Sequence, residues 1–302
     1  MRLRSMTSPV DTEIHTSGLL QLGLAGDGAL RWAVADVTEI VEEARERLDL
    51  SPVAAAALGR CLAGAALLLR LATKTPSRLL LEIRGDGPLG RVLAEADQEG
   101  NLRGMVGNPH VEVPHTPEGK LAVGRAVGKG TLRVLREHEG GASYHSQVSL
   151  VSGEIGDDVA HYLEQSEQSR SAVLLGVLAK PFGVAAAGGM IVEVLPGAPE
   201  DTIARLEKNI AGIAGVSHLV EAGGSVHVVE TLLAGMDREV RETQALRYRC
   251  RCNRERLLHH LVLLSDDDRD HLRGEDGTIE ADCAFCGSKY VYTPAELVPA
   301  VN

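Results

Sequence analysis

The sequence has few aromatic residues, no uninterrupted hydrophobic run long enough to cross a membrane, and no excess of basic residues. Only 3% of the 302 residues are aromatic, so the core is expected to consist of Leu, Val, Ala and Ile. The formal net charge of −11 argues against broad binding to phosphate backbones, which requires a basic surface. With 44% hydrophobic residues, the chain is typical of a globular protein with two modest domains or one large one.

A secretory signal is also missing, because no apolar segment follows residues 1–6. The most hydrophobic stretch, residues 53–71, contains two arginines and two glycines, which favours a buried helix over a membrane span. Without an export signal, the five cysteines are expected in a reducing cytosol. In a reducing cytosol, close cysteine pairs are more often metal ligands or redox groups than permanent disulfides. We therefore expect a cytoplasmic protein that does not bind membranes.

Nucleotide-binding motifs are absent or out of context. No GxxxxGK[ST] motif occurs, which argues against a P-loop ATPase. Residues 85–90, Gly-Asp-Gly-Pro-Leu-Gly, match GxGxxG, but residues 91–95 predict a strand. A dinucleotide site needs a helix at that position to hold the pyrophosphate. The segment is therefore interpreted as a hairpin turn.

The pattern of apolar residues predicts an α+β fold with a layered, mainly antiparallel N-terminal domain. Helices are predicted at 37–48, at about 52–72 and from Asp157 or Asp158 to about 168. Ser51 and Pro52 provide an N-cap and a first-turn proline for the second of these, which is apolar nearly all round and therefore buried. A strand hairpin is predicted within 19–34, and further strands at 79–83, 91–95, 102–106, 121–127, 132–135, 144–151, 172–179 and 190–195.

Four segments are predicted along the chain. A loose tail at residues 1–10 precedes the α+β domain, residues 11–196. A breaker cluster at 196–201 then begins a helical linker, residues 197–246, with helices at about 200–213 and 225–235. The apolar stripes of these helices are short, so we expect them to lie on another part of the protein. The last segment, residues 247–302, is a small C-terminal domain.

This last segment contains four of the five cysteines, as Cys250-Arg251-Cys252 and Cys283-Ala284-Phe285-Cys286. Two tight pairs, separated by a loop long enough to fold back, can complete a tetrahedral zinc shell. The strands predicted on either side of the second pair indicate a knuckle that brings both sulfurs to one side. We therefore predict one Zn²⁺ ion bound by four cysteine thiolates.

The spacing alone leaves the role of this zinc site open. CxxC is the usual choice for a structural site, whereas the first pair is CxC. Five arginines surround that pair: Arg247, Arg249, Arg251, Arg254 and Arg256. They can offset the formal −2 charge of zinc bound to four thiolates, or keep the sulfurs as thiolates, the form that oxidants attack, once the metal is lost. Both a purely structural site and a redox switch fit these residues.

Other candidate residues have simpler interpretations. Cys61 lies in the apolar helix and is expected to be a buried small hydrophobic residue, because no neighbouring base would activate it. His259 and His260 follow the CxC pair on a predicted helix, but four cysteines already fill a zinc shell. We expect these histidines to face solvent or to have packing roles.

Several motifs resemble one known family. Cys250-Arg-Cys252-Asn-Arg-Glu-Arg is followed by Glu-Asp-Gly-Thr-Ile-Glu at 275–280 and by Cys283-x-x-Cys286-Gly. Tyr-Leu-Glu-Gln-Ser-Glu-Gln at 162–168, Ala-Ala-Gly-Gly-Met at 186–190 and Gly-Asp-Gly-Pro at 85–88 lie upstream. Together these motifs resemble the heat shock protein 33 family of redox-regulated chaperones, and the resemblance covers essentially the whole chain after residue 10.

The resemblance implies a cytoplasmic, ATP-independent stress-response holdase and not an enzyme. In such proteins the reduced, inactive form binds one zinc through thiolates, here Cys250, Cys252, Cys283 and Cys286. Oxidation gives disulfides between sequence neighbours, Cys250–Cys252 and Cys283–Cys286. Zinc then leaves, the zinc domain and linker unfold, the protein forms a homodimer, and unfolded client proteins bind.

Because residues 247–297 contain few large apolar side chains, their fold should depend on zinc. The linker should unfold with them if it docks on that unit. We hypothesise that this unfolding exposes one face of the linker helix together with the core surface that this face covers. The linker residues concerned are Ile203, Leu206, Ile210 and Ile213.

Two rival functions follow from the same residues. One is a structural-zinc protein that binds nucleic acid through the arginines around Cys250, which the acidic charge of the whole chain argues against. The other is a thiol–disulfide oxidoreductase using Cys283 and Cys286. That function requires a βαβ context near the CxxC pair, where the sequence predicts a hairpin instead.

Overall fold

The structure is a computed structural model that describes residues 18–72 and 76–297. The first half contains β1 (Gly18–Ala25), β2 (Leu30–Asp36), α1 (Thr38–Leu48), α2 (Pro52–Leu71), β3 (Arg78–Gly85), β4 (Arg91–Asp97), β5 (Asn101–Val106) and α3 (Val123–Val127). There follow β6 (Gly130–Glu137), β7 (Ser143–Ser149), α4 (Gly156–Glu167), β8 (Ser171–Lys180), β9 (Gly183–Val194), α5 (Glu200–Ala211), α6 (Val216–Leu232) and β10 (Arg238–Tyr248). The C-terminal unit contains α7 (Arg254–Val262), α8 (Asp266–Leu272), β11 (Ile279–Asp282) and β12 (Lys289–Tyr292).

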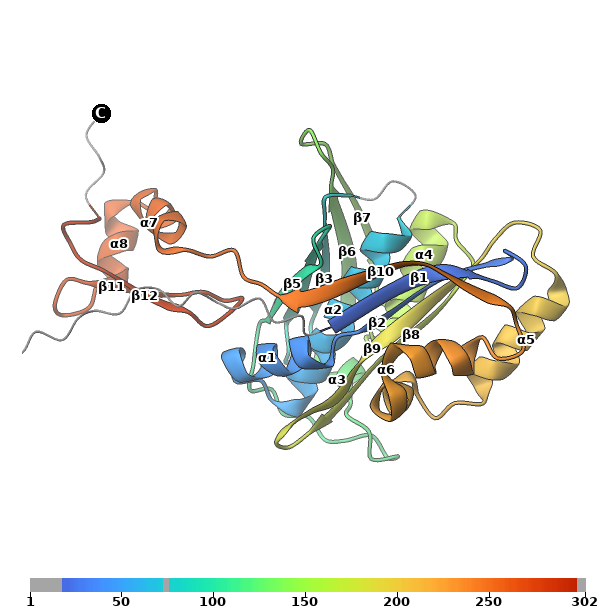
Figure 1. Ribbon diagram of the computed structural model, residues 1–302. Helices are drawn as coiled ribbons and strands as arrows, with labels where there is room; N and C mark the ends of the chain where they lie inside the picture. Colours follow the sequence, from blue (N-terminus) through green and yellow to red (C-terminus); the bar gives the residue numbers. More distant parts are fainter. Residues whose placement is uncertain (1–17, 73–75, 298–302) are drawn as a thin grey trace, which may run out of the picture.

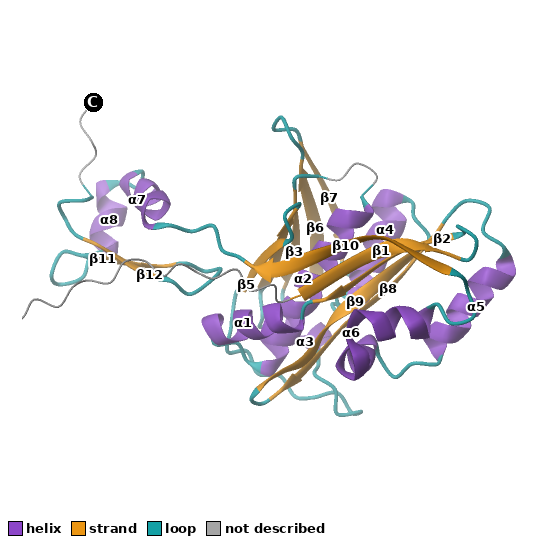
Figure 2. Cartoon of the chain, viewed as in Figure 1, coloured by secondary structure: helices purple, strands orange, loops and turns teal. Residues whose placement is uncertain are grey.

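Ten strands form one curled sheet in the order β7-β6-β3-β4-β5-β10-β1-β2-β9-β8 (Figure 1). All its pairings are antiparallel except the short contact of Arg247 and Tyr248 in β10 with Asn101 and Leu102 in β5. Strand β10 therefore joins two antiparallel halves. The small C-terminal unit projects to one side of this body, connected through the segment after β10 (Figure 2). The predicted α+β fold with a layered, mainly antiparallel domain is confirmed.

Helix α2 is the central element of the core. It packs against strands from both halves of the sheet, among them β4, β8 and β9. The Ser51 hydroxyl caps its first turn by accepting a hydrogen bond from the Ala54 amide at 3.5 Å. The helix is long and apolar enough to cross a membrane by length and composition, but 89% of its most apolar window is buried inside the protein. The prediction of a buried helix at about 52–72 is confirmed.

Helices α5 and α6 cover one face of the sheet. The cluster that joins them to the sheet contains Trp32 and Val34 of β2, Met190 and Val192 of β9, Leu206 of α5, and Val220, Val228 and Leu232 of α6. Ile210 and Ile213 pack at its edge. The short apolar stripes of the linker thus lie on another part of the protein, as predicted. That part is the sheet of the N-terminal domain and not the cysteine unit.

Two predictions of secondary structure are wrong. The sequence predicts a strand at residues 121–127, but Val123–Val127 is the short helix α3, whose Val127 carbonyl accepts a hydrogen bond from the Gly87 amide at 2.9 Å. The same contact holds residues 85–90 as the predicted turn between β3 and β4. The sequence also places residues 238–246 in a helical linker, but they belong to β10, most of whose side chains are exposed. This strand is defined by its backbone pairing with β1. Because most of its side chains face solvent, they show no alternating apolar pattern from which a strand could be predicted.

The predicted tail at residues 1–10 lies outside the described residues.

Replacing Leu206 by Ala should weaken the packing of α5 on the sheet. Leu206 is 3% exposed, so the cavity is expected to cost about 2–5 kcal/mol in the stability of this layer. Trp32 is fully buried in the same cluster and is the only tryptophan, so its fluorescence in a urea titration reports the transition. Glu207→Ala, at an exposed position of the same helix, is the control. An unchanged urea midpoint for Leu206→Ala would contradict this packing.

Candidate metal centre

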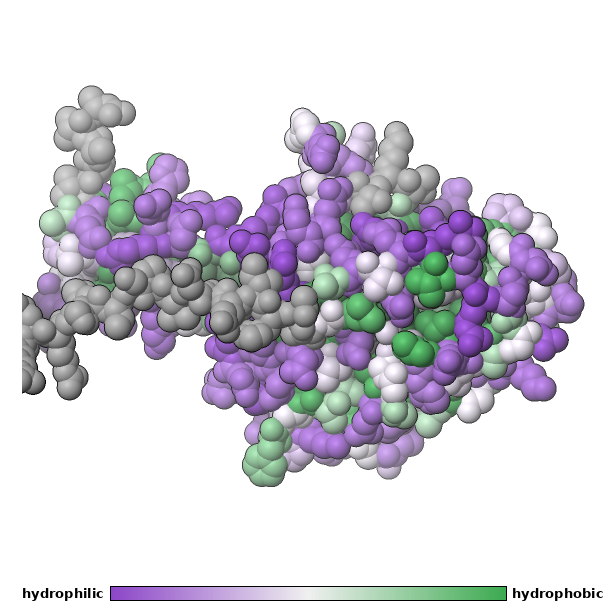
Figure 3. Space-filling view, in the orientation of Figure 1, coloured by the Kyte–Doolittle hydropathy of each residue, from purple (hydrophilic) through white to green (hydrophobic). Residues whose placement is uncertain are grey.

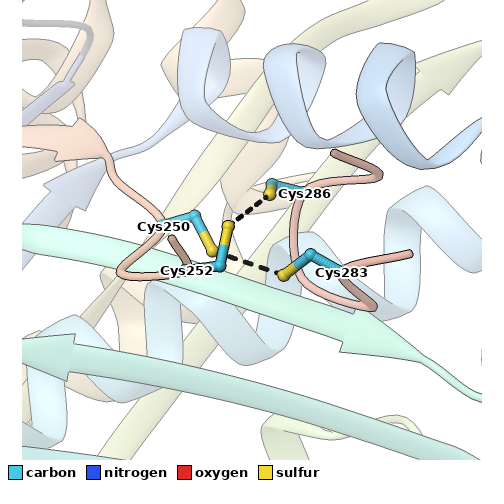
Figure 4. Close-up of side chains that lie close together, drawn as sticks. All are labelled: Cys250, Cys252, Cys283 and Cys286. Atoms are coloured by element: carbon cyan, nitrogen blue, oxygen red, sulfur yellow. Dashed lines mark hydrogen bonds between the residues drawn. The ribbon is translucent and has the colours of Figure 1, made fainter. Parts of the chain in front are cut away.

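Four cysteines converge from two segments that lie about thirty residues apart in the sequence (Figure 4). Cys250 and Cys252 lie between β10 and α7, and Cys283 and Cys286 lie in the turn between β11 and β12. Their four Sγ atoms all lie within 4.8 Å of one another. The Sγ atoms are 3.6 Å apart for Cys250 and Cys283 and 3.4 Å apart for Cys252 and Cys286.

These distances fit a metal shell and not a pair of disulfides. Four sulfurs at about 2.3 Å from a tetrahedral zinc are separated by about 3.8 Å. The sulfurs of a disulfide are separated by about 2.05 Å. All five cysteines within the described residues are free thiols. The four-sulfur cluster can therefore hold one metal ion, and an all-thiolate tetrahedral donor set favours zinc.

The turn that carries Cys283 and Cys286 is the predicted knuckle. The Cys283 amide donates to the Ser288 carbonyl at 2.9 Å, and the Gly287 amide donates to the Cys283 carbonyl at 2.8 Å. Gly287 has a φ of 67°, which a side chain would disfavour. A Cβ at this position would also lie 2.5 Å from the Arg47 carbonyl oxygen. Glycine therefore allows the turn to approach the end of α1.

The segment that carries Cys250 and Cys252 ends at a helix cap. The Asn253 side chain accepts a hydrogen bond from the Arg256 amide at 2.7 Å and begins α7. Cys252 thus lies next to the helix N-terminus. The Tyr290 hydroxyl lies 3.3 Å from the Cys252 sulfur. This contact with Cys252, followed by burial, raises the pKa of Tyr290 and keeps the phenol protonated.

The sulfurs share their protons unequally when no metal is bound. The hydrogen bond between the sulfurs of Cys286 and Cys250 lowers the pKa of Cys286 and, together with burial, raises the pKa of Cys250. Four adjacent thiolates would repel one another, so the protein alone disfavours the loss of all four protons. A bound metal ion would compensate that repulsion and allow all four sulfurs to be deprotonated.

The cluster contacts the N-terminal body through an aromatic residue at the end of β10. The Tyr248 hydroxyl donates a hydrogen bond to the carbonyl of Phe285, between the two cysteines of the knuckle. The Arg47 guanidinium of α1 lies over the Tyr248 ring, 5.5 Å from its centroid. Burial, followed by the nearby sulfurs, raises the pKa of Tyr248, which therefore remains a donor.

The arginines near Cys250 do not form one open basic surface. Arg247 donates to the Asn101 side chain at 2.6 Å, and Arg254 pairs with Glu296 at 2.6 Å. Arg251 pairs with the buried Glu95 of β4. The side chains of the remaining two, Arg249 and Arg256, are exposed. This arrangement argues against the nucleic-acid alternative, which needs several free cations on one face.

The other candidate residues do not join the cluster. Cys61 is fully buried in α2, and burial raises the pKa of its thiol, as expected for an inert packing residue. His259 and His260 are exposed on α7. Three neighbours of the cluster were not predicted from the sequence: Tyr248, Glu95, and Arg103, whose Nη1 atom lies 4.0 Å from the Cys250 sulfur. Glu95 and Arg103 come from strands far away in the sequence, so no local motif indicates them.

The cluster should bind one metal ion per chain. Zinc measured by atomic emission is expected near one equivalent, and cobalt substitution should give the thiolate charge-transfer bands of a tetrahedral site. Serine at Cys250, Cys252, Cys283 or Cys286 should lower the affinity strongly, because each contributes one sulfur. Cys61→Ser is the matched control and should keep full occupancy. Full occupancy in all four variants would contradict this site.

Comparisons with known proteins agree with this geometry. The family model described as Hsp33 protein matches residues 19–293. The chain is 47% identical to a 33 kDa chaperonin of Thermus thermophilus, and the match covers 93% of this chain and 85% of the relative. It is 42% identical to a 33 kDa chaperonin of Nostoc punctiforme, where the match covers 92% of this chain and 93% of the relative.

The crystal structure of the 33 kDa chaperonin of Thermotoga maritima, described as a heat shock protein 33 homologue, superimposes with a TM-score of 0.85. It shares 37% sequence identity, and the match covers 94% of this chain and 97% of that chain. These relatives support a chaperone function, and the resemblance predicted from the cysteine block and the upstream motifs is confirmed. The chain belongs to the Hsp33 family.

Proposed function

We propose that this protein is a redox-regulated, ATP-independent holdase in the cytoplasm, and not an enzyme. Zinc bound by Cys250, Cys252, Cys283 and Cys286 keeps it inactive, and oxidation of the same thiolates activates it. The observation that carries this proposal is the cluster of four free sulfurs within 4.8 Å of one another. One set of residues can then bind a metal or form disulfides, but not both at once.

The C-terminal unit has little else to hold it together. Its buried hydrophobic cluster consists of Leu261, Ile279, Tyr292 and Leu297. A structural zinc site contributes about 10–16 kcal/mol of binding free energy in zinc-finger peptides, comparable to the entire stability of a typical domain. When bound, zinc would supply folding free energy and stabilise the deprotonated sulfurs. Loss of the ligands should therefore unfold this unit.

The activating step balances with a peroxide as the oxidant. Four thiolates lose four electrons and form two S–S bonds, while two peroxide O–O bonds break and four protons are taken up to give water. A disulfide sulfur is a poor ligand for zinc compared with a thiolate, so the donor set is lost. The family resemblance favours Cys250–Cys252 and Cys283–Cys286 as products. All four sulfurs lie within 4.8 Å of one another, so these sequence neighbours can reach each other. The same is true of pairs formed between the two cysteine segments.

The linker provides the route from the centre to the client surface. Strand β10 connects α6 to Cys250, and its last residues pair with β5 beside the cysteines. Unfolding of the C-terminal unit would remove the Tyr248–Phe285 contact and free this end of β10. Release of α5 and α6 would then expose the apolar cluster around Trp32 and Leu206. Unfolded clients bind exposed apolar surface of this kind.

Part of the apolar surface is already exposed in the folded protein. Figure 3 shows hydrophobic residues gathered over the large body, on the face that carries β1 and β10. Val226 of α6 and Val240 of β10 are 54% and 50% exposed. We place the functional boundaries at residues 11–196 for the client-binding core, 197–246 for the linker and 247–302 for the switch. An oxidised homodimer would bring two such surfaces together.

One titration tests the proposal. Peroxide is added to zinc-loaded protein with a colorimetric chelator, and light scattering follows the aggregation of an unfolded client. Zinc release and suppressed aggregation should rise together, and reductant with zinc should reverse both. Cys61→Ser should behave as the unchanged protein, because Cys61 lies buried in α2. Equal protection of the client by the zinc-loaded and oxidised forms would rule out regulation by the cysteines.

A further inference from the structure

We infer that Arg103 of β5, held by Glu95 of β4, is a positioning residue that clamps the cysteine centre onto the core and releases it when the centre loses its negative charge. The inference rests on the proposed redox function and adds a residue outside the C-terminal unit that sets how readily the switch opens. No motif in the sequence singles out this residue.

Arg103 contacts both halves of the centre. Its Nη1 atom lies 4.0 Å from the Cys250 sulfur, in the CxC segment. Its guanidinium carbon lies over the Phe285 ring, 4.3 Å from the centroid, in the CxxC turn. The side chain is only 14% exposed, so this contact is shielded from solvent. One cation of the core therefore touches the two segments that a metal would join.

Glu95 fixes this cation in place. Glu95 and Arg103 are directly opposite each other in the antiparallel pair β4–β5, and the Glu95 carboxylate accepts from Arg103 Nη2 at 2.8 Å. The other carboxylate oxygen of Glu95 pairs with Arg251, the residue between Cys250 and Cys252. The Glu95 side chain is 7% exposed, so it is a buried anchor for two cations of the core, Arg103 and Arg78, and one of the switch, Arg251.

The charge balance around Glu95 makes the clamp sensitive to the charge of the cysteine centre. The guanidiniums of Arg78, Arg103 and Arg251 share two carboxylates, Glu95 and Glu137, which leaves one positive charge in excess. Zinc with four thiolates would carry a formal charge of −2 and compensate this excess. Two disulfides carry no charge. The balanced oxidation described above therefore removes the negative charge that faces Arg103 at the same step that removes the metal ligands, and the cysteine centre loses its charge attraction to the core.

The test replaces Arg103 by Met, which keeps a long side chain and removes the charge. Arg136→Met is the matched control, because Arg136 is 16% exposed in the same sheet and pairs with Glu167 at 2.6 Å, away from the cysteines. Trypsin cleavage within residues 247–256 measures undocking, and zinc content is measured on the same samples. We expect Arg103→Met to be cleaved roughly tenfold faster while zinc is still bound, with Arg136→Met unchanged.

Two further measurements separate a charge clamp from simple loss of stability. Arg103→Lys should restore much of the protection, because it restores the charge. The peroxide concentration that half-activates client binding should fall for Arg103→Met. If Arg103→Met fails to fold, Arg251→Met removes the cation of the switch that pairs with Glu95 and should show the same faster cleavage at the other arginines of residues 247–256.

The outcomes distinguish this inference from the proposed function. If the unchanged protein is activated by peroxide but Arg103→Met and Arg251→Met are cleaved and activated like Arg136→Met, the clamp is wrong and the redox switch stands. Equal acceleration in Arg103→Met and Arg136→Met would also overturn the clamp, since any lost ion pair would then suffice. If peroxide never activates the unchanged protein, the proposed function fails, whatever the cleavage rates.

Discussion

The contact of four sulfurs from two distant segments is the constraint on which the rest of the C-terminal unit depends. Cys250 and Cys252 follow the last strand of the large sheet, and Cys283 and Cys286 lie in a knuckle with a very small hydrophobic cluster behind it. A metal ion between the two segments would close a loop that the apolar side chains alone can hardly close. The large body, by contrast, has α2 buried between strands and needs no such support.

Strand β10 connects the cysteine cluster with the large sheet and the linker helices. The strand pairs with β1 along most of its length and with β5 only at Arg247 and Tyr248. Its end contacts the knuckle through the Tyr248 hydroxyl. The linker helices meanwhile lie on the apolar face of β2 and β9. The cysteine unit and the covered apolar face are thus connected by a strand whose end lies at the cysteines.

Much of this arrangement could be predicted from the sequence, because local patterns determine it. The apolar helix at residues 52–71, its N-cap at Ser51, and the knuckle around Cys283 and Cys286 each depend on neighbouring residues. The strand β10 and the helix α3 could not be predicted in the same way. Tertiary pairing defines β10, whose side chains are mostly exposed, and contacts with the turn at Gly87 hold α3. The surroundings of the cysteines were missed for a similar reason, since Glu95 and Arg103 meet them only after the sheet has formed.

In the proposed switch, loss of the metal–thiolate centre releases the linker from the sheet. Hydrogen–deuterium exchange should be compared between the zinc-loaded reduced protein and the peroxide-oxidised protein. Residues 249–297 are expected to lose protection first, and α5, α6 and β10 to lose it as well, while α2 remains protected. Unchanged protection of α5 and α6 in an oxidised protein that holds clients would contradict this switch.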